Sequence, residues 1–324
     1  MDKVARLPAQ QRSELFSETA TQKGTTPAVV EKDFWVTWVL NRLFQEPDLA
    51  RLLMFKGGTS LSKVYNLIER FSEDIDLVLD WRILGGDDPL AERSKTKQAQ
   101  LNAAINEQAQ KYIGGELLGM VESALDGVCD CRIDDDAFVI DINYPAAFPD
   151  DYLRSEVRLE IGPLASWLPY EERSISCYAA EVFPDVFEQR ECAVRVIKAE
   201  RTFWEKATIL HHEAHRPEGN AQPPRYSRHY YDLAKMAQSP VKEKALADPE
   251  LLASVVAFKQ RFYPRGWARY DLAKPGTLVL VPEGHVLASV RSDYRAMENM
   301  IFGEMPHIDQ ILAVLQALQE EINA

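Results

Sequence analysis

Residues 52–80 contain, in order, a strand, a pair of glycines, a helix and a second strand, and this order restricts the folds open to the chain. Residues 52–55 form a short apolar run typical of a buried strand, which the glycines end. Apolar residues at helical spacing over 59–70 predict a helix, and residues 74–80 predict another strand. Glycines at a strand-to-helix turn let the backbone approach a ligand closely, and the amides at a helix start favour an anion. The turn is therefore predicted to bind phosphate groups through Lys56, Gly57, Gly58, Thr59 and Ser60.

Two aspartates lie on the second of these strands. Asp74 and Asp76 are two residues apart, so their carboxylates share one face of the strand. Neighbouring carboxylates repel each other unless a cation lies between them, and hard divalent cations prefer oxygen ligands. We therefore predict a Mg²⁺ or Mn²⁺ site beside a turn that holds the phosphates of an NTP. This combination is typical of phosphoryl or nucleotidyl transfer.

The order of these motifs resembles the signature of the nucleotidyltransferase superfamily with the DNA polymerase β fold, in which Gly-Gly or Gly-Ser precedes Asp-x-Asp. That superfamily adds a third carboxylate on a nearby strand, and two residues compete for the role. Glu160 lies on the polar face of an alternating strand, 156–161, whereas Asp141 interrupts the apolar strand around it. We favour Glu160, because a cation beside it would compensate its charge without disturbing the alternation.

Four motifs narrow the resemblance to the AbiEii/AbiGii family of bacterial nucleotidyltransferase toxins, over about residues 25 to 320. They occur in the family's order, and they are Glu31-Lys-Asp-Phe-Trp, Phe55-Lys-Gly-Gly-Thr-Ser-Leu-Ser-Lys, Glu200-Arg-Thr-Phe-Trp-Glu-Lys206 and Arg228-His-Tyr-Tyr-Asp-Leu233. The resemblance implies a toxin of a toxin–antitoxin or phage-defence pair, with a cognate antitoxin as a possible partner. It also implies transfer of a nucleotide from an NTP to an acceptor, which for some members is the acceptor end of tRNA.

The last two motifs suggest further site residues by the same resemblance. Lys206 matches the family's essential lysine and is expected to contact the triphosphate. Asp232 matches the essential acidic residue of the last motif, and Arg228 matches the arginine that opens it. His229 departs from the Arg-Asp of many relatives, which leaves a second acidic role at that position in doubt. From spacing alone, Arg228 and Asp232 are four residues apart on a helix and could pair.

The net charge of the chain excludes a protein that coats nucleic acid. The 324 residues include 37 basic and 50 acidic side chains, a formal net charge of −13, so the chain cannot coat nucleic acid over its whole surface. Residues 190–235 depart from this balance with nine Lys or Arg against six Asp or Glu. We interpret this stretch as one wall of a groove for RNA if RNA is the acceptor.

Two other interpretations stay open. A small-molecule nucleotidyltransferase of the antibiotic-modifying kind would share the same motifs, and the acidic charge slightly favours it. A binding protein that is catalytically idle on the same fold is disfavoured by the presence of both aspartates, Asp74 and Asp76. His211 and His215 could share a helix face, but we interpret them as part of a solvated helix end and not as a metal site.

The chain is predicted to be α+β, with a polymerase β-like core followed by a helical region. Residues 1–195 are assigned to the core with its N-terminal helices, and residues 196–324 to the mainly helical C-terminal domain. No apolar run approaches the length of a membrane span, and the start is polar, so we expect a cytoplasmic protein with reduced cysteines. Besides the elements above, helices are predicted over 27–44, 198–215, 228–238, 249–262 and 307–323, and another follows the polar loop 81–96 and ends near residue 112. Strands are predicted over 129–133, 137–144 and 156–161, with 175–183 as a further candidate.

Overall fold

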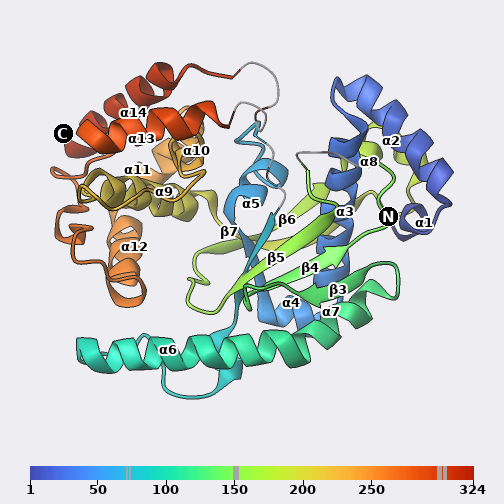
Figure 1. Cartoon of the computed structure of the whole chain (residues 1–324), viewed down its shortest axis with the longest axis horizontal. Helices are drawn as coiled ribbons and strands as arrows, with labels where there is room; N and C mark the ends of the chain where they lie inside the picture. Colours follow the sequence, from blue (N-terminus) through green and yellow to red (C-terminus); the bar gives the residue numbers. More distant parts are fainter. Residues whose placement is uncertain (71, 73, 149–152, 298–300, 302–304) are drawn as a thin grey trace. The chain divides into compact units, whose positions relative to one another are not determined.

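The sequence ranges of two structural units interleave along the chain. A computed structural model (Figure 1) describes residues 1–70, 72, 74–148, 153–297, 301 and 305–324. The first unit comprises residues 1–64 and 72–197, and the second comprises residues 65–71 and 198–324. The short segment 65–71 therefore belongs with the C-terminal part of the chain, although it lies between two elements of the first unit.

A seven-stranded mixed sheet forms the centre of the first unit (Figure 1), in the order β3-β4-β5-β2-β1-β7-β6. The pairs β1–β7 and β2–β5 are parallel, and the other neighbours are antiparallel. Every core-facing residue of β5 is buried and every other residue is half-buried, as the alternation predicted. The strands are β1 (Leu53–Lys56), β2 (Asp74–Leu79), β3 (Asp130–Ile133), β4 (Val139–Asn143), β5 (Glu156–Gly162), β6 (Tyr170–Ser176) and β7 (Glu191–Ile197).

One long helix, α3 (Pro27–Gln45), packs against β7 and β5. It begins where the sequence predicts, because the Thr26 side chain accepts a hydrogen bond from the backbone N–H of Val29 and Pro27 occupies the first helical turn. The other helices of this unit are α1 (Asp2–Ala5), α2 (Ala9–Lys23), α4 (Pro47–Leu52), α5 (Gly57–Lys63), α6 (Lys95–Tyr112), α7 (Leu118–Leu125) and α8 (Tyr178–Val182), with a π-helical turn over Ile113–Leu117.

The second unit is built from helices. Helix α10 (Ser227–Ala237) packs against α9 (Ala199–Ala214), α13 (Gly284–Arg295) and α14 (Ile308–Asn323), and α9 also contacts α11 (Val241–Leu246) and α12 (Pro249–Phe262). Tyr230, Tyr231 and Leu233 of α10 are fully buried. Among the helices that the structure describes, none is both long and apolar enough to cross a membrane.

The structure confirms the mixed α+β architecture and corrects two elements. The helix predicted over 59–70 is wrong beyond Lys63, because α5 ends there and Asn66 takes a left-handed conformation with φ 51°. The strand predicted over 175–183 is also misplaced: β6 ends at Ser176, and residues 178–182 form α8. Strand β7 was not predicted, although its apolar and polar residues alternate.

His211 is buried and is not part of a solvated helix end. Its Nδ1 atom accepts a hydrogen bond from the backbone N–H of Val279 at 3.0 Å, and its Nε2 atom lies 2.9 Å from the carbonyl oxygen of Arg269. These partners require the neutral ring, with its proton on Nε2. Burial lowers the pKa of His211 to about 4, and the nearby His215 and His212 also lower it. The ring therefore ties α9 to two later segments only while it is uncharged.

We expect the second unit to lose stability as the pH falls below the ordinary histidine pKa. The unfolded chain takes up a proton at His211 near pH 6.5, and the folded chain resists it down to about 4, so this contribution is complete above pH 6.5 and is lost between those values. Between pH 7.5 and 5 the loss amounts to about 2 kcal/mol. Urea unfolding at both pH values should show it, and His211→Asn should flatten the dependence by that amount.

The exposed His285 on α13 gives the matched control for this measurement. His285→Asn shows what the loss of an exposed histidine does to the same measurement. An equal flattening in both variants would contradict the assignment to His211.

Candidate active site

Charged side chains form two rows across one face of the sheet in the first unit. In the first row, Asp76 on β2 lies opposite Lys56 on β1 and Glu160 on β5. Residues opposite each other on neighbouring strands have adjacent side chains on the same face, so the two carboxylates are neighbours. Like charges in that relation destabilise a sheet unless a cation compensates them. This row therefore has the chemistry of a cation site.

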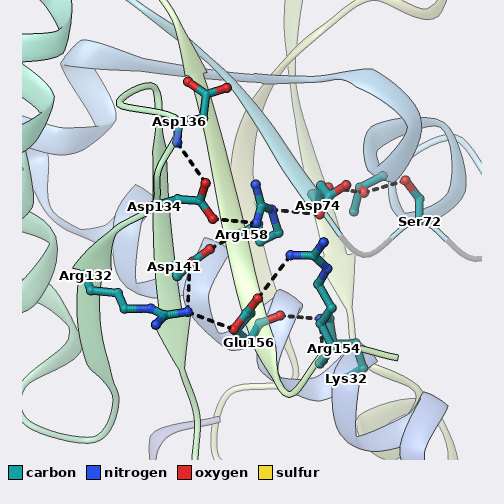
Figure 2. Close-up of polar contacts among 11 residues, drawn as sticks. Lys32, Ser72, Asp74, Arg132, Asp134, Asp136, Asp141, Arg154, Glu156 and Arg158 are labelled. Atoms are coloured by element: carbon teal, nitrogen blue, oxygen red, sulfur yellow. Dashed lines mark hydrogen bonds and ion pairs between the residues drawn. The ribbon is translucent and has the colours of Figure 1, made fainter. Parts of the chain in front are cut away.

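The second row alternates in charge. Asp74 on β2 lies opposite Arg158 on β5, Arg158 lies opposite Asp141 on β4, and Asp141 lies opposite Arg132 on β3. Figure 2 shows the ion pairs along this row. Arg158 Nη1 lies 3.5 Å from Asp141 Oδ1, and Arg132 Nη2 lies 3.2 Å from Asp141 Oδ2. The negative charge of Asp141 is thus shared between two arginines.

These rows separate the two residues proposed as the third carboxylate. Glu160 is the cross-strand neighbour of Asp76, whereas Asp141 lies two strands away from β2, with Arg158 between it and Asp74. Asp141 is 1% exposed, and its pKa is raised by burial, with a further contribution from Glu156. The register favours Glu160 over Asp141. Within the described residues, no three His, Cys, Asp or Glu side chains are already gathered as a metal cluster.

The turn before α5 lies directly against the carboxylate of Asp76. Gly57 has φ +80°, and a Cβ atom at this position would lie 1.9 Å from Asp76 Oδ2. Only glycine avoids both the strained backbone and the collision. Thr59 Oγ1 donates to the carbonyl oxygen of Asp74 and lies 2.9 Å from Ser72 Oγ, and Ser60 Oγ donates to the Gly57 carbonyl oxygen at 2.8 Å. Both hydroxyls are buried, so in this structure they bind the protein's own backbone.

Gly57→Ala is expected to destabilise the first unit by more than its backbone angle explains. A left-handed alanine costs about 1–2 kcal/mol, and the overlap with Asp76 adds about 1–3 kcal/mol. Gly86 is the matched control, because its φ is +93° and a Cβ there would meet no atom within 4 Å. Chemical unfolding should show Gly86→Ala losing only the backbone cost. Equal losses in the two variants would show that the contact with Asp76 is unimportant.

Three consecutive charged residues of α3 are buried beneath this site. Asp33 pairs with Lys63 at the end of α5 and accepts a hydrogen bond from the backbone N–H of Tyr178 at 2.7 Å. Lys32 donates to the carbonyl oxygens of Arg154 and Glu156, where β5 begins. Glu31 accepts from the backbone N–H groups of residues 147 and 148. The first helix motif therefore anchors both the end of α5 and the strand that carries Glu160.

Lys63→Met is expected to cost about 3–5 kcal/mol, because it leaves the buried carboxylate of Asp33 without its cation. Lys23 is the matched control: both lysines lie about 5 Å from the Tyr178 ring, but the pair of Lys23 with Glu181 is exposed. Lys23→Met should cost less than about 1 kcal/mol. Thermal and urea unfolding of the two variants give the comparison, and a small loss for Lys63→Met would mean that α5 is held by other contacts.

A second charged cluster lies in the helical unit. Asp232 is fully buried, and its carboxylate binds Arg70 through Nε at 2.6 Å and Nη2 at 2.8 Å, and Lys206 Nζ at 2.7 Å. Burial would raise the pKa of the Asp232 carboxyl, but Arg70 and Lys206 hold it well below its usual range. His229 lies 3.5 Å from Lys206 Nζ, and burial together with this lysine lowers its pKa, so the ring is neutral. Asp232 thus pairs with Arg70 and Lys206, and not with Arg228 as the helical spacing allowed.

Three of the nine basic residues in the stretch 190–235 are buried and cannot belong to an exposed wall. Arg201, Lys206 and Arg216 are each less than 9% exposed, and each pairs with a carboxylate of the same unit. Lys235 pairs with Glu69, whereas Arg225 is exposed and Arg228 is half-buried. Lys206 and Arg216 therefore neutralise the buried acids Asp232 and Glu213.

Sequence reasoning missed the roles of four residues that the structure places at these clusters. Arg70 ends a segment that was interpreted as helix, so nothing in its spacing indicated the pair with Asp232. Lys63 and Asp33 were quoted within motifs, and nothing in their spacing indicated that they pair. Arg158 was predicted on the polar face of β5, where its position between Asp74 and Asp141 follows only from the strand order.

A mixed sheet in which a strand–glycine–helix turn lies against paired carboxylates is typical of proteins that catalyse nucleotidyl transfer. The family described as nucleotidyl transferase AbiEii toxin, type IV toxin–antitoxin system, matches residues 38–314. The chain belongs to this family of nucleotidyltransferase toxins, which confirms the resemblance seen in the sequence.

Among solved structures, the chain is similar to MenT4, a nucleotidyltransferase toxin from Mycobacterium tuberculosis. The two chains are 16% identical, with a TM-score of 0.45, and the alignment covers 98% of this chain and 97% of MenT4. A comparison with curated protein sequences gives no match.

Proposed function

We propose that the protein transfers a nucleoside monophosphate from an NTP to a hydroxyl group of an RNA acceptor, with Mg²⁺ or Mn²⁺ held by Asp74, Asp76 and Glu160. In this reaction an acceptor oxygen bonds to the α-phosphorus, the bond to the β-phosphate oxygen breaks, and pyrophosphate leaves. The bound metal ion supplies charge stabilisation for the phosphates and a lower pKa for the attacking hydroxyl.

The observation that carries this proposal is the row Lys56–Asp76–Glu160. Two carboxylates face each other across parallel strands, and the glycine turn lies against one of them. Such a donor set fits a hard divalent cation, because its ligands are carboxylate oxygens on rigid strands. The turn from Lys56 to Ser60 would then hold the phosphates through Lys56 and backbone amides, since the hydroxyls of Thr59 and Ser60 already donate within the protein.

The roles proposed for the helical unit rest on the family resemblance. Lys206 is proposed to contact the triphosphate and Asp232 to act on the attacking hydroxyl, with Arg228 as a further phosphate contact. The close pair of Lys206 with Asp232 implies that a phosphate would compete with this carboxylate for the ammonium group. A Lys206→Glu variant would place two carboxylates side by side in a buried site, so Lys206→Met is the better probe of nucleotide affinity.

An RNA such as tRNA is proposed as the acceptor, and an antitoxin as the partner that opposes the toxin in the cell. A small-molecule acceptor is the second candidate, and one observation favours it: three of the basic residues expected to line an RNA groove are buried in ion pairs. The net charge of −13 points the same way.

Asp76→Asn and Glu160→Gln are expected to lower nucleotide transfer on the order of 10³-fold, because each removes about 4 kcal/mol of charge stabilisation at the metal. Glu156→Gln is the matched control, since Glu156 lies on the same face of β5 and pairs with Arg132 and Arg154. The rate of label transfer from an α-³²P-labelled NTP gives the measurement. A folded Asp76→Asn variant with wild-type activity would contradict the metal site.

One experiment separates the acceptors. The purified protein is incubated with each labelled NTP, Mg²⁺ or Mn²⁺, and either total RNA or a panel of hydroxyl-bearing antibiotics. Label in an RNA band supports the first proposal, and label in a small molecule with blank RNA supports the second. Transfer to neither, with intact NTP binding, would support the catalytically idle protein.

A further inference from the structure

We propose that Arg158 is a positioning residue that sets the cation affinity of Asp74, acting as a built-in positive charge that Asp134 and Asp141 hold beside the metal site. The inference rests on the proposed metal role of Asp74 and Asp76. It assigns a regulatory task to a side chain that has no place among the proposed metal ligands or phosphate contacts.

The guanidinium of Arg158 contacts three carboxylates (Figure 2). Nη1 donates a hydrogen bond to Asp134 Oδ2 at 2.9 Å and lies 3.5 Å from Asp141 Oδ1. Nε lies 3.9 Å from Asp74 Oδ1, which is an electrostatic contact and too long for a hydrogen bond. Arg158 is therefore held by Asp134 and Asp141, which lie on the side of the guanidinium away from Asp74. Its contact with Asp74 itself is longer.

This asymmetry has an electrostatic consequence. The Arg158 side chain is 15% exposed and that of Asp141 is 1% exposed, so their charges are weakly screened by water. A cation that binds Asp74 meets the positive guanidinium at close range, while the negative charges of Asp134 and Asp141 offset part of that repulsion. Cation affinity at Asp74 should therefore depend on how tightly Asp134 holds the guanidinium away.

Arg132 provides a matched comparison. Both arginines form an ion pair with Asp141, through its two different oxygens. Arg132 lies on β3, three strands from β2 in the sheet order, and its other carboxylate partner is Glu156. Loss of Arg132 removes the same kind of support from Asp141 as loss of Arg158, but it removes no charge beside Asp74.

The test measures Mn²⁺ binding by calorimetry and by electron paramagnetic resonance, in the full chain without nucleotide. Arg158→Gln should tighten Mn²⁺ binding about ten-fold, because a like charge near the site is removed. Asp134→Asn should weaken it about three-fold or more, because the guanidinium is released toward Asp74. Arg132→Gln should leave the affinity within two-fold of the wild type. The proposal therefore predicts that Mn²⁺ affinity changes in opposite directions in Arg158→Gln and Asp134→Asn.

Two controls keep the outcome decisive. If Arg158→Gln fails to fold because Asp141 keeps only Arg132 as its partner, Asp134→Asn and the charge-preserving Arg158→Lys carry the test. Arg158→Lys should bind Mn²⁺ nearly as the wild type does. Unchanged or weaker binding in folded Arg158→Gln, or unchanged binding in Asp134→Asn, would overturn the inference. Asp74→Asn marks the underlying site: if it binds Mn²⁺ like the wild type, the metal role of Asp74 fails instead.

Discussion

Asp76 and Glu160 lie opposite each other on two parallel strands, and the proposed site of the first unit depends on this pairing of like charges. A sheet avoids placing like charges opposite each other, because the pair gains nothing from packing and pays for desolvation. In the neighbouring row, Arg158 lies between Asp74 and Asp141, and Arg132 lies beyond Asp141. The first row holds one lysine against two carboxylates, so it keeps a net negative charge on β2 and β5.

The strands and the turn of such a site must be held in fixed relative positions by the residues packed against them. The three buried charges of α3 provide it, because each is tied to a different segment: Asp33 to α5, Lys32 to the start of β5, and Glu31 to the loop after β4. Hydrogen bonds from buried charged groups are strong and directional, so they fix the register of the segments that they join. A purely apolar helix would pack against the sheet equally well, but it would not fix the position of the glycine turn relative to the Asp76 carboxylate.

Sequence reasoning reached the parts of the molecule that repeat with a regular period. The strands around Asp74 and Glu160 and the long helices were predicted because alternation and helical spacing survive in their residues. The segment after Lys63 was misassigned because its apolar residues happen to have helical spacing, whereas the chain there turns at Asn66 and joins the other unit. The burial of His211 and the use of basic residues against buried acids could not be predicted, since both depend on which distant segments meet.

Because residues 65–71 belong to the second unit, part of that unit is synthesised long before the rest of it. Arg70 is synthesised 162 residues before Asp232, the carboxylate that it grips. A fragment that begins after residue 197 lacks that arginine and leaves Asp232 with Lys206 alone, so the helical unit cannot be completed from its own contiguous sequence. On the ribosome, the buried cluster can close only after residue 232 of the 324 has emerged, and a chain that ends before it carries the aspartates of the first unit without this cluster.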